Sequence, residues 1–329
     1  MRRARRLLLA FLAFVACLVA QAVRAEDAPD SIPTSDQLVE ADSSAVLGVH
    51  RAFWKAYQDR DLWGMRQIWD NANGNITAAF PAASFTAAGW ANVEENFRRT
   101  FVHNRDIKID ERVIRLHRQG NVAWILGSVR FEAVQTQTGQ FVAMDRMLTT
   151  ELYRLRDGVW KLELYHGDYP GFSPPKEHSP IFQLQAIAAP LRSPSDAWDT
   201  YDRFIAAFER REISGVFDLL TADADASAIQ PISAVPFLGP QNVIASWKKA
   251  FDEIQSITIQ PQRLVIDQDG DIAWISEAGQ YHVMFRANPG DVVHMHNVMV
   301  TYILRRRRAE WQLVHYHAHQ GFPYEDQEH

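Results

Sequence analysis

Histidines dominate the residues of this chain that could perform chemistry. His166 and His317 occupy equivalent places in two similar stretches, Trp160-Lys-Leu-Glu-Leu-Tyr-His166 and Trp311-Gln-Leu-Val-His-Tyr-His317. Histidine is the usual proton donor and acceptor near neutral pH, because its ordinary pKa lies at about 6.5. The two residues are therefore the first candidates for acid–base catalysis. The alternative is a structural role, in which the rings bond to neighbouring strands or helices.

The second stretch carries a denser set of histidines. His315, His317 and His319 alternate along the sequence, so a β-strand would place them on one face. Three histidines can hold Zn²⁺ with a fourth position open for water, which would make a hydrolytic site. Strand alternation places His294 and His296 on the opposite face, away from this set. A metal site is therefore the less favoured interpretation, and no cofactor is expected.

Carboxylates offer a second route to proton transfer. An isomerase or a dehydratase needs a base that apolar walls desolvate, and a donor that holds a developing oxyanion. Asp168 at the end of one strand and Glu277 within an otherwise apolar strand could be the bases. Tyr57 or Tyr281 could be the donor. None of these residues recurs at the matched position of the other stretch, which favours binding over a reaction shared by both.

The similarity between the two stretches extends over whole domains. Val122-Ala-Trp124 returns 150 residues later as Ile272-Ala-Trp274, and Trp160 returns 151 residues later as Trp311. Solenoid repeats are only ~20–50 residues long, whereas this period has the size of a domain. The sequence predicts two copies, at residues 45–172 and 196–323. A proline-rich linker, residues 173–195, joins them, and residues 324–329 form a tail.

The N-terminus has the pattern of an export signal. A charged start, Met1–Arg6, is followed by an apolar run and two candidate cleavage sites, Ala20-Gln-Ala22 and Val23-Arg-Ala25. We expect a signal peptide at residues 1–25, a lead-in at 26–44 and a periplasmic or secreted protein, with an uncleaved anchor as the alternative. We expect no stable membrane association after cleavage.

The composition excludes several other classes of protein. The only cysteine, Cys17, lies in the expected signal, so the mature chain has no disulfide and no thiolate site. A net charge of −6 without a basic patch argues against nucleic acid as a partner. A hydrophobic content of 47% with ten tryptophans is ample for two packed cores.

Each copy reads as helices followed by strands. Apolar residues recur at three- and four-residue spacing in the first helix of each copy, and β-rich segments with hairpin turns follow. The expected helices span residues 45–59, 62–69 and 93–100 in the first copy and 198–209, 213–220 and 243–252 in the second. This order predicts an α+β fold, with three helices packed on one face of a curved antiparallel sheet.

The motifs, taken in order, resemble the SnoaL-like branch of the nuclear-transport-factor-2-like superfamily. They are an aromatic first helix, Gly89 or Gly239 before the third helix, a Gly-Asn/Asp-x-Ala-Trp strand and the closing Trp-x-Leu-x-x-Tyr-His strand. The resemblance covers both copies and implies two cone-shaped α+β barrels, each with a pocket between sheet and helices. The superfamily includes ketosteroid isomerase-like enzymes, polyketide cyclases and dehydratases, and non-catalytic binding or association domains. The fold alone does not choose among them.

Strand alternation predicts which residues line each pocket. Trp160, Leu162, Leu164 and His166 share one face of their strand, and charged residues occupy the other. Because the first helices are rich in aromatic residues, the expected ligand is a small apolar or aromatic molecule. The predicted lining residues besides the histidine pair and Asp168 are Tyr57, Arg146, Thr150, Leu164, Glu277, Asn297, Thr301, His315 and His319.

An apolar outer sheet face predicts how the two copies associate. The same alternation places Val298, Val300, Tyr302 and Leu304 on the outer face of the second sheet, and such a face should be covered. The other copy is the simplest cover, which predicts an intramolecular pseudo-dimer.

Four functions are compatible with this sequence. The favoured one is an exported two-domain SnoaL-like protein that binds a small apolar or aromatic molecule. The alternatives are an isomerase, dehydratase or cyclase that uses a histidine, a metal-dependent hydrolase, and an interaction scaffold with filled barrels.

Overall fold

The structure is a computed structural model that describes residues 43–81, 86–169, 196–231 and 233–320. The chain divides into two units, residues 1–38 and 39–329, and all described residues belong to the second. The predicted signal peptide, the linker, the tail and nearly all of the lead-in lie outside the described residues. Among the residues that are described, no helix is long and apolar enough to cross a membrane.

The described residues of the first domain form three helices and six strands. The sheet has the strand order β2-β1-β6-β5-β4-β3. In chain order the elements are α2 (Ser44–Asp59), α3 (Leu62–Ile68), β1 (Thr77–Ala79), β2 (Ala87–Ala88), α4 (Trp90–His103), β3 (Asn104–Gln119), β4 (Val122–Gln135), β5 (Phe141–Arg156) and β6 (Val159–Asp168).

The second domain repeats this arrangement. Its sheet has the strand order β8-β7-β12-β11-β10-β9, so β7 to β12 occupy the same places as β1 to β6 of the first domain. The elements are α5 (Ala197–Arg210), α6 (Ile213–Leu219), β7 (Ser227–Ile229), β8 (Phe237–Leu238), α7 (Pro240–Glu253), β9 (Ile254–Asp269), β10 (Ile272–Phe285), β11 (Val292–Arg307) and β12 (Glu310–Gln320).

These elements confirm the predicted α+β fold and refine it in two respects. Each sheet is mixed rather than antiparallel, because β1 runs parallel to β6 and β7 runs parallel to β12. Each sheet is also open, since its two outermost strands have no partner on one side. The cone is therefore a strongly curved sheet that is not closed into a barrel.

Glycines with a positive φ begin the third helix of each domain. Gly89 precedes α4 with φ 75°, and Gly239 precedes α7 with φ 84°. Residues with a side chain rarely adopt this conformation, so glycine is the residue that fits there. The matched glycines explain why the sequence repeats at these two points.

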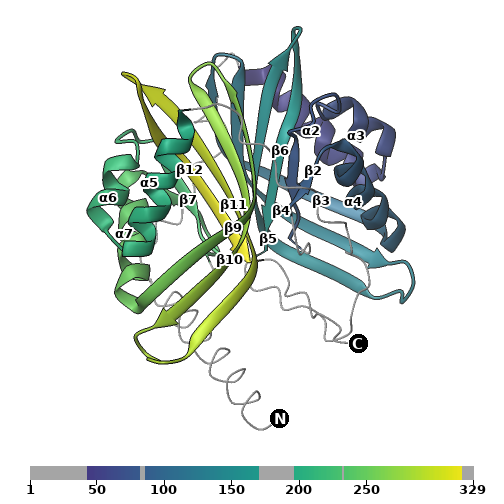
Figure 1. Ribbon diagram of the computed structural model, residues 1–329. Coiled ribbons are helices and arrows are strands. Elements are labelled where there is room, and N and C mark those ends of the chain that lie inside the picture. Colours follow the sequence, from purple (N-terminus) through teal and green to yellow (C-terminus); the bar gives the residue numbers. More distant parts are fainter. Residues whose placement is uncertain (1–42, 82–85, 170–195, 232, 321–329) are drawn as a thin grey trace. The chain divides into compact units, whose positions relative to one another are not determined.

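The helices cover one face of each sheet (Figure 1). In the first domain, Phe53, Trp54 and Phe97 from the helices pack against Tyr153 and Tyr165 of the sheet. The second domain has an equivalent core, which includes Phe204, Trp247, Tyr302 and Tyr316. Each cone is therefore filled by rings from both layers.

A third apolar cluster lies on the opposite faces of the sheets. Its members come from both domains, and all of them are buried. From the first domain they are Ile114, Val122, Trp124, Leu126, Leu148, Leu152 and Leu164; from the second they are Ile229, Ile272, Trp274, Ile303 and Val314. The two sheets thus contribute side chains to one shared core.

A β-bulge in the last strand of each domain makes the predicted side-chain orientation wrong. The register between β5 and β6 shifts by one residue at Glu163, and the register between β11 and β12 shifts at Val314. A bulge places two residues opposite one and so reverses the alternation beyond it. Trp160 and Leu162 face the helices as predicted, but Leu164 and His166 face the shared core.

The same correction applies to β5 and β11. Val298, Val300, Tyr302 and Leu304 belong to the helix-covered core of the second domain, not to an outer face. Leu148 and Leu152, which share a face of β5 with the predicted lining residue Thr150, belong to the shared core. The hydrophobicity of the residues did not distinguish the two faces of a sheet, because both faces are buried. The helices of the same domain cover one face, and the sheet of the other domain contacts the opposite face.

The shared core predicts a large stability effect at Leu152. We expect Leu152→Ala to lower the free energy of unfolding by about 2–5 kcal/mol, because the side chain is fully buried and its loss leaves a cavity. Val159→Ala, in the next strand, should change it by less than about 0.5 kcal/mol, because Val159 is 52% exposed. Urea unfolding measures both, and equal effects would contradict this packing.

Candidate functional site

His166 and His317 meet face to face between the two sheets. Their rings are stacked with centroids 3.8 Å apart and planes 11° apart, and both side chains are fully buried. His166 lies on β6 and His317 on the equivalent strand, β12. The two residues that the sequence matched thus contact each other, and neither points into a cone.

Two threonines bind this pair in a symmetric manner. A hydrogen bond of 2.8 Å joins Thr301 Oγ1 to His166 Nδ1, and another of 2.8 Å joins Thr150 Oγ1 to His317 Nδ1. Thr150 and Thr301 occupy matched positions on β5 and β11. Each domain therefore supplies the threonine that orients the histidine of the other.

The rest of the cluster is asymmetric. His315 bonds through Nε2 to Thr150 Oγ1 at 2.9 Å and through Nδ1 to Ser227 Oγ at 2.9 Å. His319 Nδ1 lies 2.6 Å from His166 Nε2. The first domain has Leu164 and Asp168 at the positions of His315 and His319, so it offers no equivalent partners.

Three buried polar atoms of this cluster have no hydrogen-bond partner among the described residues. They are His317 Nε2, His319 Nε2 and Asp168 Oδ2. Burial raises the pKa of the Asp168 carboxyl well above its ordinary value, and one backbone hydrogen bond from Tyr169 opposes this only in part. Burial thus favours the neutral form of the Asp168 carboxyl.

The four clustered histidines are held in the neutral form. Burial lowers the pKa of His315 and of His319 to about 3. It also lowers the pKa of His166 and of His317 well below 6.5, and the neighbouring histidines lower both further. An effective acid–base catalyst titrates near the working pH. These groups do not, so the geometry favours the structural alternative for them.

The histidines are not arranged as a metal site. Among the described residues, no group of three or more His, Cys, Asp or Glu side chains is placed to hold a metal ion. Both ring nitrogens of His315 are engaged in hydrogen bonds, one to Ser227 and one to Thr150.

Inside the first cone lies an ion-pair network that the sequence analysis missed. Glu151 Oε2 lies 2.7 Å from His50 Nδ1, and its carboxylate also accepts hydrogen bonds from Tyr153 and, at 3.0 Å, from Trp54. His50 Nε2 lies 3.1 Å from Glu111. Burial alone would lower the pKa of His50, but the two carboxylates raise it to about 10. His50 is thus a buried imidazolium between two carboxylates.

Inside the second cone, three tyrosines surround a single carboxyl. Glu277 accepts hydrogen bonds from Tyr302 at 2.7 Å, Tyr201 at 3.1 Å and Tyr281 at 3.2 Å. Burial raises the pKa of Glu277, and the tyrosine bonds counteract this in part. Glu277 and Tyr281, the candidate base and donor predicted from the sequence, are thus in direct contact.

The two networks occupy equivalent places with different residues. Tyr201 stands at the position of His50, and Tyr302 at that of Glu151. The carboxyl of the second domain comes from a different strand. Glu277 lies on β10, at the position of Gly127 on β4, whereas Glu151 lies on β5. The signal for Glu151 is that it is the one charged residue of the stretch Leu148–Tyr153. Strand alternation had placed its counterpart Tyr302 on the outer face.

The remaining predicted lining residues lie in different places. Tyr57 packs in the first cone against Phe97 and Phe101, and burial raises its pKa. Arg146 and Asn297 occupy matched positions with φ of 61° and 57°, next to irregularities of their strands, and Arg146 is exposed. Thus no single pocket contains the predicted set.

A further polar cluster links the domains around Arg154. This guanidinium forms ion pairs with Asp269 at 2.9 Å, Asp267 at 3.2 Å and Glu163 at 3.6 Å, and stacks on Trp274. Burial and the nearby Asp70 raise the pKa of Glu163 to about 7. Glu163 lies on the face of β6 that strand alternation assigned to charged residues, but there it is buried in this cluster and not solvated.

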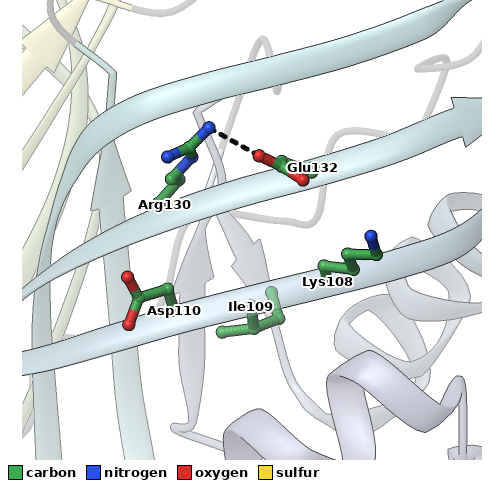
Figure 2. A pocket seen from close by; sticks show the side chains of 5 residues that line it. All are labelled: Lys108, Ile109, Asp110, Arg130 and Glu132. Atoms are coloured by element: carbon green, nitrogen blue, oxygen red, sulfur yellow. Dashed lines mark ion pairs between the residues drawn. The ribbon is translucent and has the colours of Figure 1, made fainter.

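A shallow surface depression lies over β3 and β4 (Figure 2). Its lining residues are Lys108, Ile109, Asp110, Arg130 and Glu132. Arg130 and Glu132 form an ion pair of 2.7 Å. The depression is charged, and so it differs from the apolar pocket that the sequence predicted between sheet and helices.

The family of the chain follows from a sequence comparison. The model of the SnoaL-like domain matches twice, over residues 46–170 and 198–324. The chain therefore belongs to the SnoaL-like family and contains two such domains in tandem, as the sequence motifs predicted.

Solved structures of similar proteins each resemble a part of the chain. A nuclear-transport-factor-2-like superfamily protein from Salmonella enterica is 13% identical, with coverage of 40% of this chain and 92% of that one and a TM-score of 0.35. A ketosteroid isomerase-like protein from Erwinia carotovora atroseptica is 17% identical, with coverage of 38% of this chain and 94% of that one and a TM-score of 0.33. No curated protein matches the chain.

The asymmetry of the threonine bonds predicts unequal effects of matched substitutions. Thr150→Val leaves nitrogens of two buried histidines unpaired, whereas Thr301→Val leaves one. Each unpaired buried group costs about 1–3 kcal/mol. We expect Thr150→Val to lower the free energy of unfolding more than Thr301→Val. The reverse order in urea unfolding would contradict the network.

The lowered histidine pKa values predict a specific pH dependence. A group whose pKa is lower in the folded state contributes stability above pH 6.5 and loses it as the pH falls. For His319, with a pKa of about 3, the loss between pH 7.5 and 5.0 is on the order of 2 kcal/mol. The glutamine of the variant His319→Gln cannot titrate. Between pH 7.5 and 5.0 we therefore expect the free energy of unfolding of this variant to fall by about 2 kcal/mol less than that of the wild type. Urea unfolding at both pH values tests this, and parallel losses would contradict it.

Proposed function

We propose that this chain is an exported, non-catalytic interaction scaffold, built as a pseudo-dimer of two SnoaL-like domains with filled cones. The observation that carries the proposal is the aromatic packing of the space between sheet and helices in both domains. In this superfamily that space is where a pocket would be expected. Its filling leaves the outer surfaces as the part of the molecule that meets a partner.

The packing of the first cone supports this proposal. Aromatic side chains of the helices and of the sheet contact one another throughout this core. The centroids of neighbouring rings lie 4.9–6.5 Å apart. This is the spacing of packed aromatic pairs in protein cores. The participating residues are Phe53, Trp54, Tyr57, Trp69, Phe80, Phe97, Phe101, Phe131 and Tyr165.

The second cone is packed in a similar way by different rings. The ring centroid of Trp247 lies 5.6 Å from those of both Phe204 and Tyr316, and the centroids of Phe208 and Phe251 lie 4.9 Å apart. Glu277, the one carboxyl in this core, already accepts three hydrogen bonds from the protein itself. Its bonding capacity is thus largely used within the fold.

The protonation states of the buried groups also favour a scaffold over an enzyme. His50 has a pKa of about 10, whereas His315 and His319 have pKa values of about 3. None of these imidazoles exchanges protons readily near neutral pH, which acid–base catalysis requires.

Two parts of the proposal rest on other observations. The N-terminal sequence pattern supports export. The shared apolar core and the threonine–histidine bonds between the sheets support an intramolecular pseudo-dimer.

Binding of a small molecule within a cone is the second candidate. It is favoured by the buried carboxylates, since Oε1 of Glu151 and Oε1 of Glu277 each accept one hydrogen bond and retain capacity for another. A ligand would reach them only if some of the surrounding rings moved.

Cavity-forming substitutions test whether the cones are filled. Phe97 and Trp247 occupy matched positions and are almost fully buried. We expect Phe97→Ala and Trp247→Ala to lose about 3–5 kcal/mol of stability and to gain binding of benzene and indole, respectively. The wild type should bind neither in ligand-observed NMR, and Phe97→Leu is a milder variant for use if Phe97→Ala unfolds.

Two results would overturn the scaffold proposal. The first is binding of benzene or indole by the wild type as strongly as by the variants, which would mean that a cone is open. The second is an organic molecule retained in native mass spectra of the exported chain and lost on Glu151→Gln or Glu277→Gln. That result would support the second candidate.

A further inference from the structure

We propose that His282 and His294 form a surface chelate for a divalent transition-metal ion, with Cu²⁺ bound most tightly. The two histidines lie on β10 and β11, outside the buried cluster. The proposal is independent of the scaffold function, because it concerns a different face and different residues.

The first observation is the placement of the two rings. His282 and His294 are direct cross-strand partners in the antiparallel pair of β10 and β11. Their Nδ1 atoms lie 2.6 Å apart, and the ring planes are inclined by 77°. The two Nδ1 atoms thus face each other, and the backbone ladder fixes the spacing of the two residues.

The second observation is the surroundings of the pair. His294 and His296 are exposed, and His282 is half-buried, so an ion can reach them from solvent. His296 lies two residues along the same strand, with its ring stacked at 6.4 Å from that of His294. Gln260 Oε1 lies 3.4 Å from His282 Nε2 on the neighbouring strand. His296 therefore offers a third imidazole near the pair, and Gln260 can accept a hydrogen bond from His282 Nε2.

The spacing of the nitrogens favours one type of geometry. Ligands about 2.0 Å from a metal lie roughly 2.8 Å apart at the 90° angle of a square-planar ion and roughly 3.3 Å apart in a tetrahedron. The observed 2.6 Å is nearer to the square-planar value, so the rings need to part only slightly. Cu²⁺ prefers that geometry and stands highest in the divalent affinity order.

Coordination also requires a change of tautomer. A hydrogen bond between two Nδ1 atoms needs a proton on one of them, whereas a metal needs a lone pair on both. The proton of the donor ring moves to its Nε2 through solvent, which leaves a lone pair on each Nδ1 to bind the metal. Water molecules complete the coordination. This agrees with the finding that no described group of three or more ligating side chains is arranged around one point.

The first domain provides an internal comparison. Glu132, Ala143 and Asp145 stand at the positions of His282, His294 and His296. There Arg130 pairs with Glu132 at 2.7 Å and with Asp145 at 3.2 Å, as Figure 2 shows for the first of these pairs. That face is neutralised by ion pairs, so we expect a single Cu²⁺ site for each chain.

Titration of the full chain with CuCl₂ at pH 7.5 tests the proposal. Calorimetry should give one tight Cu²⁺ per chain, and electron paramagnetic resonance should give a square-planar spectrum with nitrogen ligands. We expect His282→Ala and His294→Ala each to weaken binding by about tenfold or more, because either change destroys the chelate. His296→Ala should have a smaller effect, and substitution of His103, which lies on α4 of the first domain, should have none.

Other outcomes would overturn the proposal. They are wild-type affinity in both His282→Ala and His294→Ala, loss of the tight site on His103→Ala, or no tight Cu²⁺ in the wild type. Circular dichroism confirms that each variant is folded, which we expect because the substituted side chains lie at the surface.

Discussion

The burial of neutral histidines between two β-sheets is the constraint on which the rest of the structure depends. His166 and His317 stack at 3.8 Å, and each is oriented by a threonine of the other domain at 2.8 Å. Burying a polar ring is costly unless its nitrogens are hydrogen-bonded, and each of these two rings has its Nδ1 bonded to a threonine. The bonds therefore fix the register of one sheet on the other, and the apolar cluster around Trp124 and Trp274 supplies the burial.

The two cones show how a duplicated domain can keep its fold while its polar core diverges. The first holds an imidazolium between Glu111 and Glu151, and the second holds one carboxyl among three tyrosines. Both satisfy a buried carboxyl with donors from the first helix and the sheet, because an unpaired one would be costly. This equivalence favours a structural role for the networks, since a shared reaction would constrain the residues more closely.

Much of the fold followed from the sequence, whereas the orientation of its side chains did not. The helix expected at 45–59 spans Ser44–Asp59, and the repeat of Trp160 and Trp311 correctly indicated two domains. His166 was predicted to face a pocket and instead faces the other sheet. The reason is the bulge at Glu163, which reverses the alternation in a strand buried on both faces. Such a bulge leaves no clear mark in the residue pattern.

Cleavage between the domains tests the central claim most directly. A protease site inserted between residues 173 and 195 would be cut in the purified protein, and the products examined by size-exclusion chromatography at pH 7.5. The account predicts that the wild-type halves stay together as one particle. It also predicts that His317→Glu, which places a charge against His166 and Thr150, separates them into folded halves. Separation of the wild-type halves, or their association despite His317→Glu, would contradict it.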